Sequence, residues 1–64
     1  MIQIAASEIR SVLRDIPFTS LNYTQKRNAV IRILRRRGDS NSSDYADKLI
    51  RNIPNVNWEI LTNL

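Results

Sequence analysis

The amino-acid sequence predicts an all-α protein, a compact bundle of about four short helices. Apolar residues recur at the 3.6-residue spacing of a helix, and Pro and Gly separate the resulting stripes. No segment alternates convincingly with the two-residue period of a strand. The 64 residues make a single domain, residues 1–64. A domain of this size has a net stability of only about 3–5 kcal/mol.

The first predicted helix covers Ile2–Ile16 and ends at Pro17, because a proline forces the preceding residue out of the α region. A short connector with Phe18 and Leu21 as apolar anchors follows it. The apolar stripe of this helix consists of Ile2, Ala5, Ala6, Ile9, Val12, Leu13 and Ile16.

The second predicted helix runs from Asn22 to about Arg37. Asn22 and Gln25 have the spacing of a capping box, and Gly38 suits the left-handed residue that ends a helix. The residues expected to face inward are Tyr23, Val30, Ile33 and Leu34, with Ile31 on the flank.

Two shorter helices complete the predicted bundle. A polar loop over 39–43 leads into a third helix, about Asp44–Ile53, which Pro54 closes. Asn57 then caps a last helix through Leu64. Val56 and Leu61 have the spacing of a hydrophobic staple, and Trp58 is the largest expected core contributor. The third helix is expected to bury Tyr45, Ala46, Leu49, Ile50 and Ile53.

The composition argues against an enzyme. The chain has no Cys and no His, so it offers neither a thiolate nor an imidazole base, and a zinc ion would lack its usual ligands. Gly38 is the only glycine, which excludes a glycine-rich phosphate loop. We therefore expect no catalytic residue, no metal and no cofactor. Without a signal-peptide pattern or an apolar run of membrane-spanning length, we expect a cytoplasmic protein.

Positive charge is concentrated in one segment. Residues 24–37 carry six basic residues and no acid, a charge of +6, whereas the remaining four basic and six acidic residues sum to −2. This pattern predicts an electrostatic docking face for an acidic protein or a nucleic acid. A solvated helix face without a partner is the alternative. The predicted basic face consists of Arg32, Arg35, Arg36, Lys26 and Arg37.

A protein partner is favoured over nucleic acid. In a helix-turn-helix protein the third helix would enter the major groove, and Asp44 and Asp47 at its start would repel phosphates. The expected linker Gly38–Ser43 is also longer than the turn of that motif. Nonspecific contact of the basic face with RNA or DNA stays an alternative, and a membrane partner is not expected. The predicted acidic counter-face for head-to-tail association consists of Asp44, Asp47 and Glu59.

A pattern of apolar and basic residues extends from Ile16 to Trp58. It comprises the connector Ile16–Leu21, the Lys/Arg-rich segment Lys26–Gly38 ending in Arg-Arg-Gly, and Leu49-Ile50-Arg51 followed by Pro54, Val56 and Trp58. This pattern resembles the bacterial effector-associated domains, small death-fold-like adaptors of prokaryotic conflict systems. The resemblance implies a protein–protein interaction module that couples a sensor or NTPase to an effector. Its expected partner is a protein with a related helical domain, or a second copy of the chain.

Overall fold

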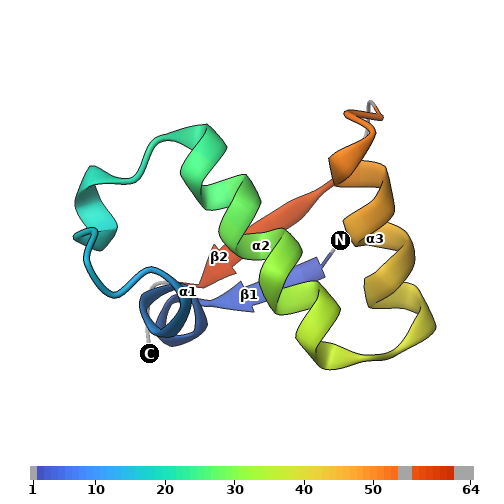
Figure 1. Ribbon diagram of the computed structural model, residues 1–64, viewed down its shortest axis with the longest axis horizontal. Coiled ribbons are helices and arrows are strands. Elements are labelled where there is room, and N and C mark those ends of the chain that lie inside the picture. Colours follow the sequence, from blue (N-terminus) through green and yellow to red (C-terminus); the bar gives the residue numbers. More distant parts are fainter. Residues whose placement is uncertain (1, 54–55, 62–64) are drawn as a thin grey trace.

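The computed structural model describes residues 2–53 and 56–61, and these form a small mixed α/β fold (Figure 1). They contain three α-helices, one 3₁₀ helix and a two-stranded parallel sheet. The prediction of an all-α, death-fold-like bundle of four helices is therefore wrong. In chain order the elements are β1 (Ile2–Ala5), α1 (Ala6–Val12), η1 (Phe18–Ser20), α2 (Tyr23–Arg37), α3 (Ser40–Ile50) and β2 (Trp58–Leu61).

The sheet replaces the first turn of the first predicted helix and residues 58–61 of the last one, whose final three residues lie outside the described chain. β1 and β2 pair in parallel, with Ile2 opposite Trp58, although they lie at opposite ends of the described chain. Gln3 and Glu59 are exposed on one face of the sheet, and the alternate residues face the core. These inward residues are Ile2, Ile4, Trp58 and Ile60.

The two strands have a local reason to form. Ile2-Gln3-Ile4 and Trp58-Glu59-Ile60 each alternate apolar and polar residues, and Ile and Trp pack well in pleated strands. Each strand has only four residues, however. An alternation of that length supplies two inward side chains, which a single helical turn could also supply. The strand signal was therefore present but too short to outweigh the helical one.

Helix α2 is the centre of the molecule. It passes in front of both strands, with α3 on one side and α1 at the end where β1 finishes (Figure 1). The predictions that Val30, Ile33 and Leu34 are buried in α2, and Ala46 and Leu49 in α3, are confirmed. The buried apolar core comprises Ile4, Ala6, Ile9, Leu21, Ala29, Val30, Ile33, Leu34, Ala46 and Leu49.

Several apolar residues expected inside lie at the surface. Tyr23 is 66% exposed because it begins α2 at the edge of the packed region, where its ring stacks on Trp58 with centroids 6.0 Å apart. Ile50 is exposed because the inner face of α3 is centred on its buried residues Ser42, Ala46 and Leu49. Ile53 is exposed beyond the end of that helix, and Tyr45 and Trp58 are half-buried.

Helix α3 begins and ends earlier than predicted. The Asp39 carboxylate accepts a hydrogen bond from the Ser42 backbone N–H at 3.1 Å, so the predicted polar loop is mostly the first turn of α3. At the other end Asn52 adopts a left-handed φ of 55°. The backbone N–H groups of Asn52 and Ile53 donate to the carbonyls of Leu49 and Lys48, the pattern of a Schellman motif. Pro54, predicted to close this helix, lies outside the described residues.

The residues that cap both ends of α2 are the predicted ones, whereas α1 is shorter than predicted. Asn22 and Gln25 form the capping box, with bonds of 2.8 and 3.0 Å, and Gly38 has a left-handed φ of 75°. Helix α1 ends at Val12 instead of Ile16. The pattern up to Pro17 is therefore only partly helical.

The cap of α3 predicts a pH dependence of stability. The hydrogen bond from the Ser42 side chain, followed by that from its backbone N–H, holds the pKa of Asp39 below its ordinary value of 3.8. A carboxyl with a lowered folded-state pKa adds stability above its unfolded pKa and loses it as the pH falls through the folded value. Asn caps a helix about as well as Asp but does not titrate. We expect Asp39→Asn to melt close to wild type at neutral pH and to lose less stability below about pH 4.

Circular-dichroism melts of both proteins from neutral pH to about pH 2.5 check this expectation. The comparison cancels the other carboxyl groups, which the two proteins share. Parallel curves for wild type and Asp39→Asn over the whole range would contradict a role for the Asp39 charge.

Candidate basic docking face

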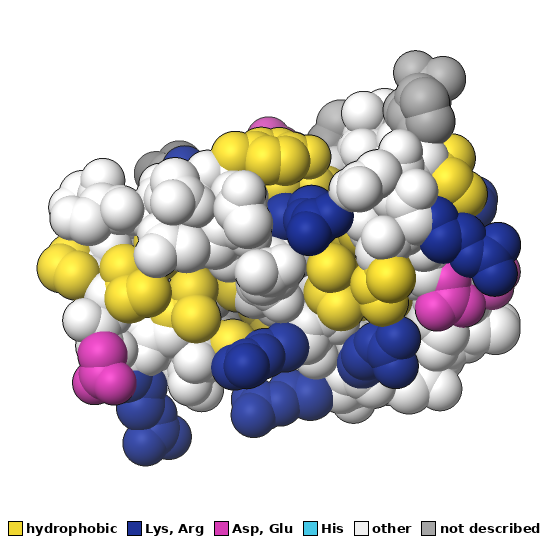
Figure 2. Space-filling view, turned by 45° about the horizontal axis from the view of Figure 1, so that its top comes forward, with side chains coloured by type: hydrophobic (Ala, Val, Ile, Leu, Met, Phe, Trp, Pro, Cys, Tyr) yellow, Lys and Arg dark blue, Asp and Glu magenta, His cyan; other side chains and the backbone are white. Residues whose placement is uncertain are grey.

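Three of the five predicted basic-face residues share the solvent side of α2. Arg32, Arg35 and Arg36 are all exposed, on the side away from the buried residues Val30 and Leu34. We call these three arginines the α2 basic face. Figure 2 shows Lys and Arg side chains spread over one face of the molecule, with apolar groups between them and acidic groups at its margins.

Arg32 and Arg36 are the two arginines of the α2 basic face whose charge is not balanced by a neighbouring carboxylate of the described residues. Within residues 2–53 and 56–61, neither guanidinium makes a hydrogen bond or an ion pair. They lie four positions apart on α2, so their side chains are neighbours on one helix face. Like charges at this spacing destabilise an isolated helix by about 0.2–0.5 kcal/mol. An acidic partner would remove this repulsion.

Arg35 is partly compensated by α3. Its guanidinium lies 3.9 Å from the Asp47 carboxylate, and both side chains are about 60% exposed. A pair so long and so exposed contributes little to stability. Asp47, predicted for a separate acidic face, therefore lies directly beside the basic one.

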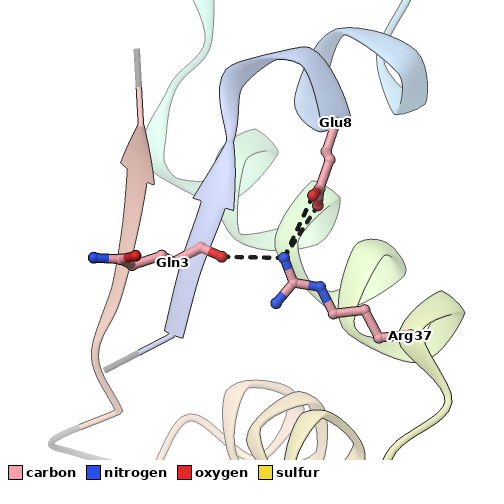
Figure 3. A network of polar contacts seen from close by, with 3 residues as sticks. All are labelled: Gln3, Glu8 and Arg37. Carbon is pink, nitrogen blue, oxygen red and sulfur yellow. Dashed lines mark hydrogen bonds and ion pairs between the residues drawn. The ribbon is translucent and has the colours of Figure 1, made fainter. Parts of the chain in front are cut away.

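Arg37, also predicted for the basic face, has a structural role instead. One of its Nη atoms donates to the Gln3 carbonyl at 3.1 Å and lies 3.3 Å from a Glu8 carboxylate oxygen (Figure 3). This arginine thus joins the end of α2 to both β1 and α1. Lys26, half-buried in α2, also does not belong to the exposed face.

Arg27 is a structural residue that sequence reasoning missed. Its Nη1 donates to the Leu49 carbonyl at 3.1 Å and to the Asn52 side-chain oxygen at 2.6 Å. It therefore gives the Leu49 carbonyl a second donor beside the Asn52 backbone N–H and ties α2 to the end of α3. Arg27 lies three positions before Val30 and seven before Leu34, so helical periodicity could have placed it on the inward side of α2. Its partners could not be predicted, because they depend on where α3 ends.

The predicted acidic counter-face is not a single surface. Asp44 and Asp47 are both exposed on α3, three positions apart. Glu59 instead lies on the exposed face of the sheet, in β2. Head-to-tail association through all three carboxylates as one face is therefore not supported by their placement.

A pocket of about 250 Å³ lies between α1 and α2, next to the basic face. It combines apolar, hydroxyl and charged groups, and sequence reasoning did not find it. Its residues repeat at helical spacing on each helix, but only the packing of α1 on α2 brings the two sets together. The lining consists of Glu8, Ser11, Val12, Ile33, Arg36 and Arg37.

The connection between α2 and α3 is shorter than predicted. Only Gly38 and Asp39 separate the two helices, so the expected linker over Gly38–Ser43 is wrong. Its length therefore does not argue against a helix-turn-helix arrangement. The exposed carboxylates of Asp44 and Asp47 on α3 still disfavour phosphate binding there.

The described part of the chain lacks two further features. Its residues include no group of three or more acidic, Cys or His side chains that could hold a metal ion. Among its helices, none has the length and apolarity required to cross a membrane. Comparison of the chain with protein-family models, with curated proteins and with solved structures finds no match.

Proposed function

We propose that this chain is a non-catalytic protein-binding module, and that the α2 basic face docks on an acidic surface of a partner protein. The observation that carries the proposal is that Arg32 and Arg36 are exposed on one side of the central helix and have no hydrogen bond or ion pair within residues 2–53 and 56–61. Complementary charge would set partner choice and association rate more than affinity.

The distribution of acids favours a protein over a nucleic acid. Asp47 lies beside Arg35, Glu8 beside Arg37, and Asp44 is exposed on the same helix as Asp47. A phosphate backbone presents negative charge at regular intervals and would meet these carboxylates as well as the arginines. A protein surface can place acids opposite Arg32 and Arg36 and basic or neutral groups opposite the flanking carboxylates.

The resemblance to effector-associated domains suggests which proteins the partner would be. They are a sensor or NTPase protein, an effector, or another copy of the chain. The fold of the described residues is not the all-helical one that the resemblance implies. The proposal therefore depends on the charged surface of α2 and not on the resemblance.

Charge reversal of the basic face is the test. We expect Arg32→Glu with Arg36→Glu to reduce capture of the partner at least about tenfold in salt of about 150 mM, since both substitutions oppose the acidic surface. The matched control is Arg14→Glu with Arg51→Glu, which makes the same change in net charge at exposed residues outside α2. Quantitative affinity capture with the three baits, after far-UV circular dichroism shows equal helicity, gives the comparison.

Each outcome is informative. Loss of capture with the face variant but not with the control supports the proposal. Equal loss with both variants indicates a nonspecific effect of net charge and contradicts it. Saturable binding of fluorescent oligonucleotides that weakens steeply with salt and needs Arg32 and Arg36 would replace it with the nucleic-acid alternative. Light scattering identifies a second copy of the chain as the partner.

A further inference from the structure

The pocket between α1 and α2 has an apolar floor and a polar rim. Ile33 is 4% exposed and Val12 is half-buried, and these two side chains supply the apolar part of the lining. Ser11 and Arg36 are exposed at the rim and offer a hydroxyl and a guanidinium. A pocket of this kind suits a ligand that has an apolar group and an anionic group close together.

The charges of the lining leave one cation unmatched. The two carboxylate oxygens of Glu8 lie 3.3 and 3.5 Å from the Arg37 guanidinium, which the Gln3 carbonyl also holds (Figure 3). Glu8 and Arg37 therefore compensate each other. No carboxylate of the described residues pairs with Arg36, so the lining has a formal net charge of about +1, which matches a single carboxylate.

The size of the pocket limits the ligand further. Its volume of about 250 Å³ is below the range of about 300–1,000 Å³ that holds drug-sized ligands. A nucleotide is too large and carries more negative charge than one arginine balances. A single amino-acid residue is the right size.

We propose that this pocket binds the C-terminal residue of a partner chain that ends in Leu, Ile or Val. The Arg36 guanidinium and the Ser11 hydroxyl donate to the terminal carboxylate, and the aliphatic side chain lies on Val12 and Ile33. A C-terminal aliphatic residue carries both groups on one Cα, whereas a Glu side chain would bring only its two methylenes to the apolar floor. This inference rests on the proposed function in taking the occupant to be part of the protein that the α2 basic face binds.

A peptide titration tests the occupant. The probe is acetyl-Ala-Ala-Leu with a free carboxylate, added to the ¹⁵N-labelled chain and followed by NMR. We expect saturable shifts centred on Ser11, Val12, Ile33 and Arg36, with a Kd of about 1–10 mM, since one small residue makes few contacts. The same peptide as its C-terminal amide should bind at least about tenfold more weakly because the charge-assisted bonds are lost.

Two results of the titration would overturn the inference. Equal binding of the acid and the amide would show that the carboxylate is not recognised, and so would the absence of saturable shifts at about 20 mM acid. A third peptide, acetyl-Glu-Ala-Ala amide, has only a side-chain carboxylate. Tighter binding of this peptide would assign the pocket to an internal acidic residue instead.

Variants separate this inference from the proposed function. We expect Arg36→Gln to weaken binding of the Leu peptide about tenfold, and Ser11→Trp to block it by filling the pocket. Arg32→Glu changes the basic face but no lining residue, so it should leave peptide binding unchanged and still reduce partner capture. If the Leu peptide does not bind but Arg32→Glu still reduces partner capture, only the inference about the pocket is overturned. If the Leu peptide binds but Arg32→Glu with Arg36→Glu leaves capture intact, the proposed function is overturned, and with it the assignment of the occupant to that partner. Recognition of a C-terminal aliphatic residue by the pocket is then retained.

Discussion

Replacing Ile4 by Ala should remove most of the stability of the protein at 25 °C. Ile4 is fully buried in the middle of β1, where its side chain belongs to the core formed with the helices. Truncating a buried Ile to Ala costs about 2–5 kcal/mol, because the lost transfer free energy is joined by a cavity term. A domain of this size has only about 3–5 kcal/mol of net stability. Urea titration followed by far-UV circular dichroism would measure the change in the free energy of unfolding.

The neighbouring residue Gln3 provides the control for this experiment. Its side chain is exposed, and it accepts the hydrogen bond from Arg37 through its backbone carbonyl. Gln3→Ala should therefore change the free energy of unfolding by no more than about 0.5 kcal/mol. The comparison also tests the strand itself, because a helix over Ile2–Ile16 would leave Ile4 outside its buried stripe. A small effect of Ile4→Ala would contradict the strand and favour that helix.

The second large effect is expected at Arg37. Arg37→Met keeps much of the aliphatic stem but removes the bond to the Gln3 carbonyl and the ion pair with Glu8. The pair is about one third exposed, so screening by water and salt reduces its contribution. Together the two interactions should contribute about 1–2 kcal/mol. We expect a melting temperature lower by roughly 5–15 °C, since each kcal/mol shifts the midpoint of a small domain by about 4–8 °C.

Two further measurements divide this effect between its parts. Glu8→Gln should reproduce only the salt-sensitive portion, because it leaves the bond from Arg37 to Gln3 in place. Arg32→Met is the matched control, since Arg32 has no bond within the described residues. A melting temperature for Arg37→Met equal to that of Arg32→Met would contradict the structural role of Arg37.

The sequence predicted best what depends on neighbouring residues. The capping box of Asn22 and Gln25, the left-handed Gly38 and the inward residues of α2 all follow from interactions within a few positions. The exposure of Arg32, Arg35 and Arg36 follows from the same helical periodicity. The start of α3 was also encoded locally, but Asp39 as a cap was overlooked because Ser and Asn residues follow it.

The sheet and the roles of individual arginines could not be predicted in this way. Whether Ile2–Ala5 becomes a strand depends on Trp58–Leu61, nearly the whole chain away, and no local pattern states that pairing. Periodicity separates Arg37 from Arg36, because Arg37 lies seven positions after Val30 on the inward side of α2. It does not predict that Gln3 and Glu8 lie opposite Arg37 after folding. The pocket combines α1 and α2 residues for the same reason.

The parallel direction of β1 and β2 has a mechanical consequence. Because the strands run the same way, Ile2 at the start of β1 and Leu61 at the end of β2 lie at opposite ends of the sheet. A pull on these two residues slides one strand along the other. Every bond between the strands then carries load at the same time, whereas an antiparallel hairpin pulled at its open end would lose its bonds one after another. A tether attached at these two ends therefore meets the sheet in its most resistant direction.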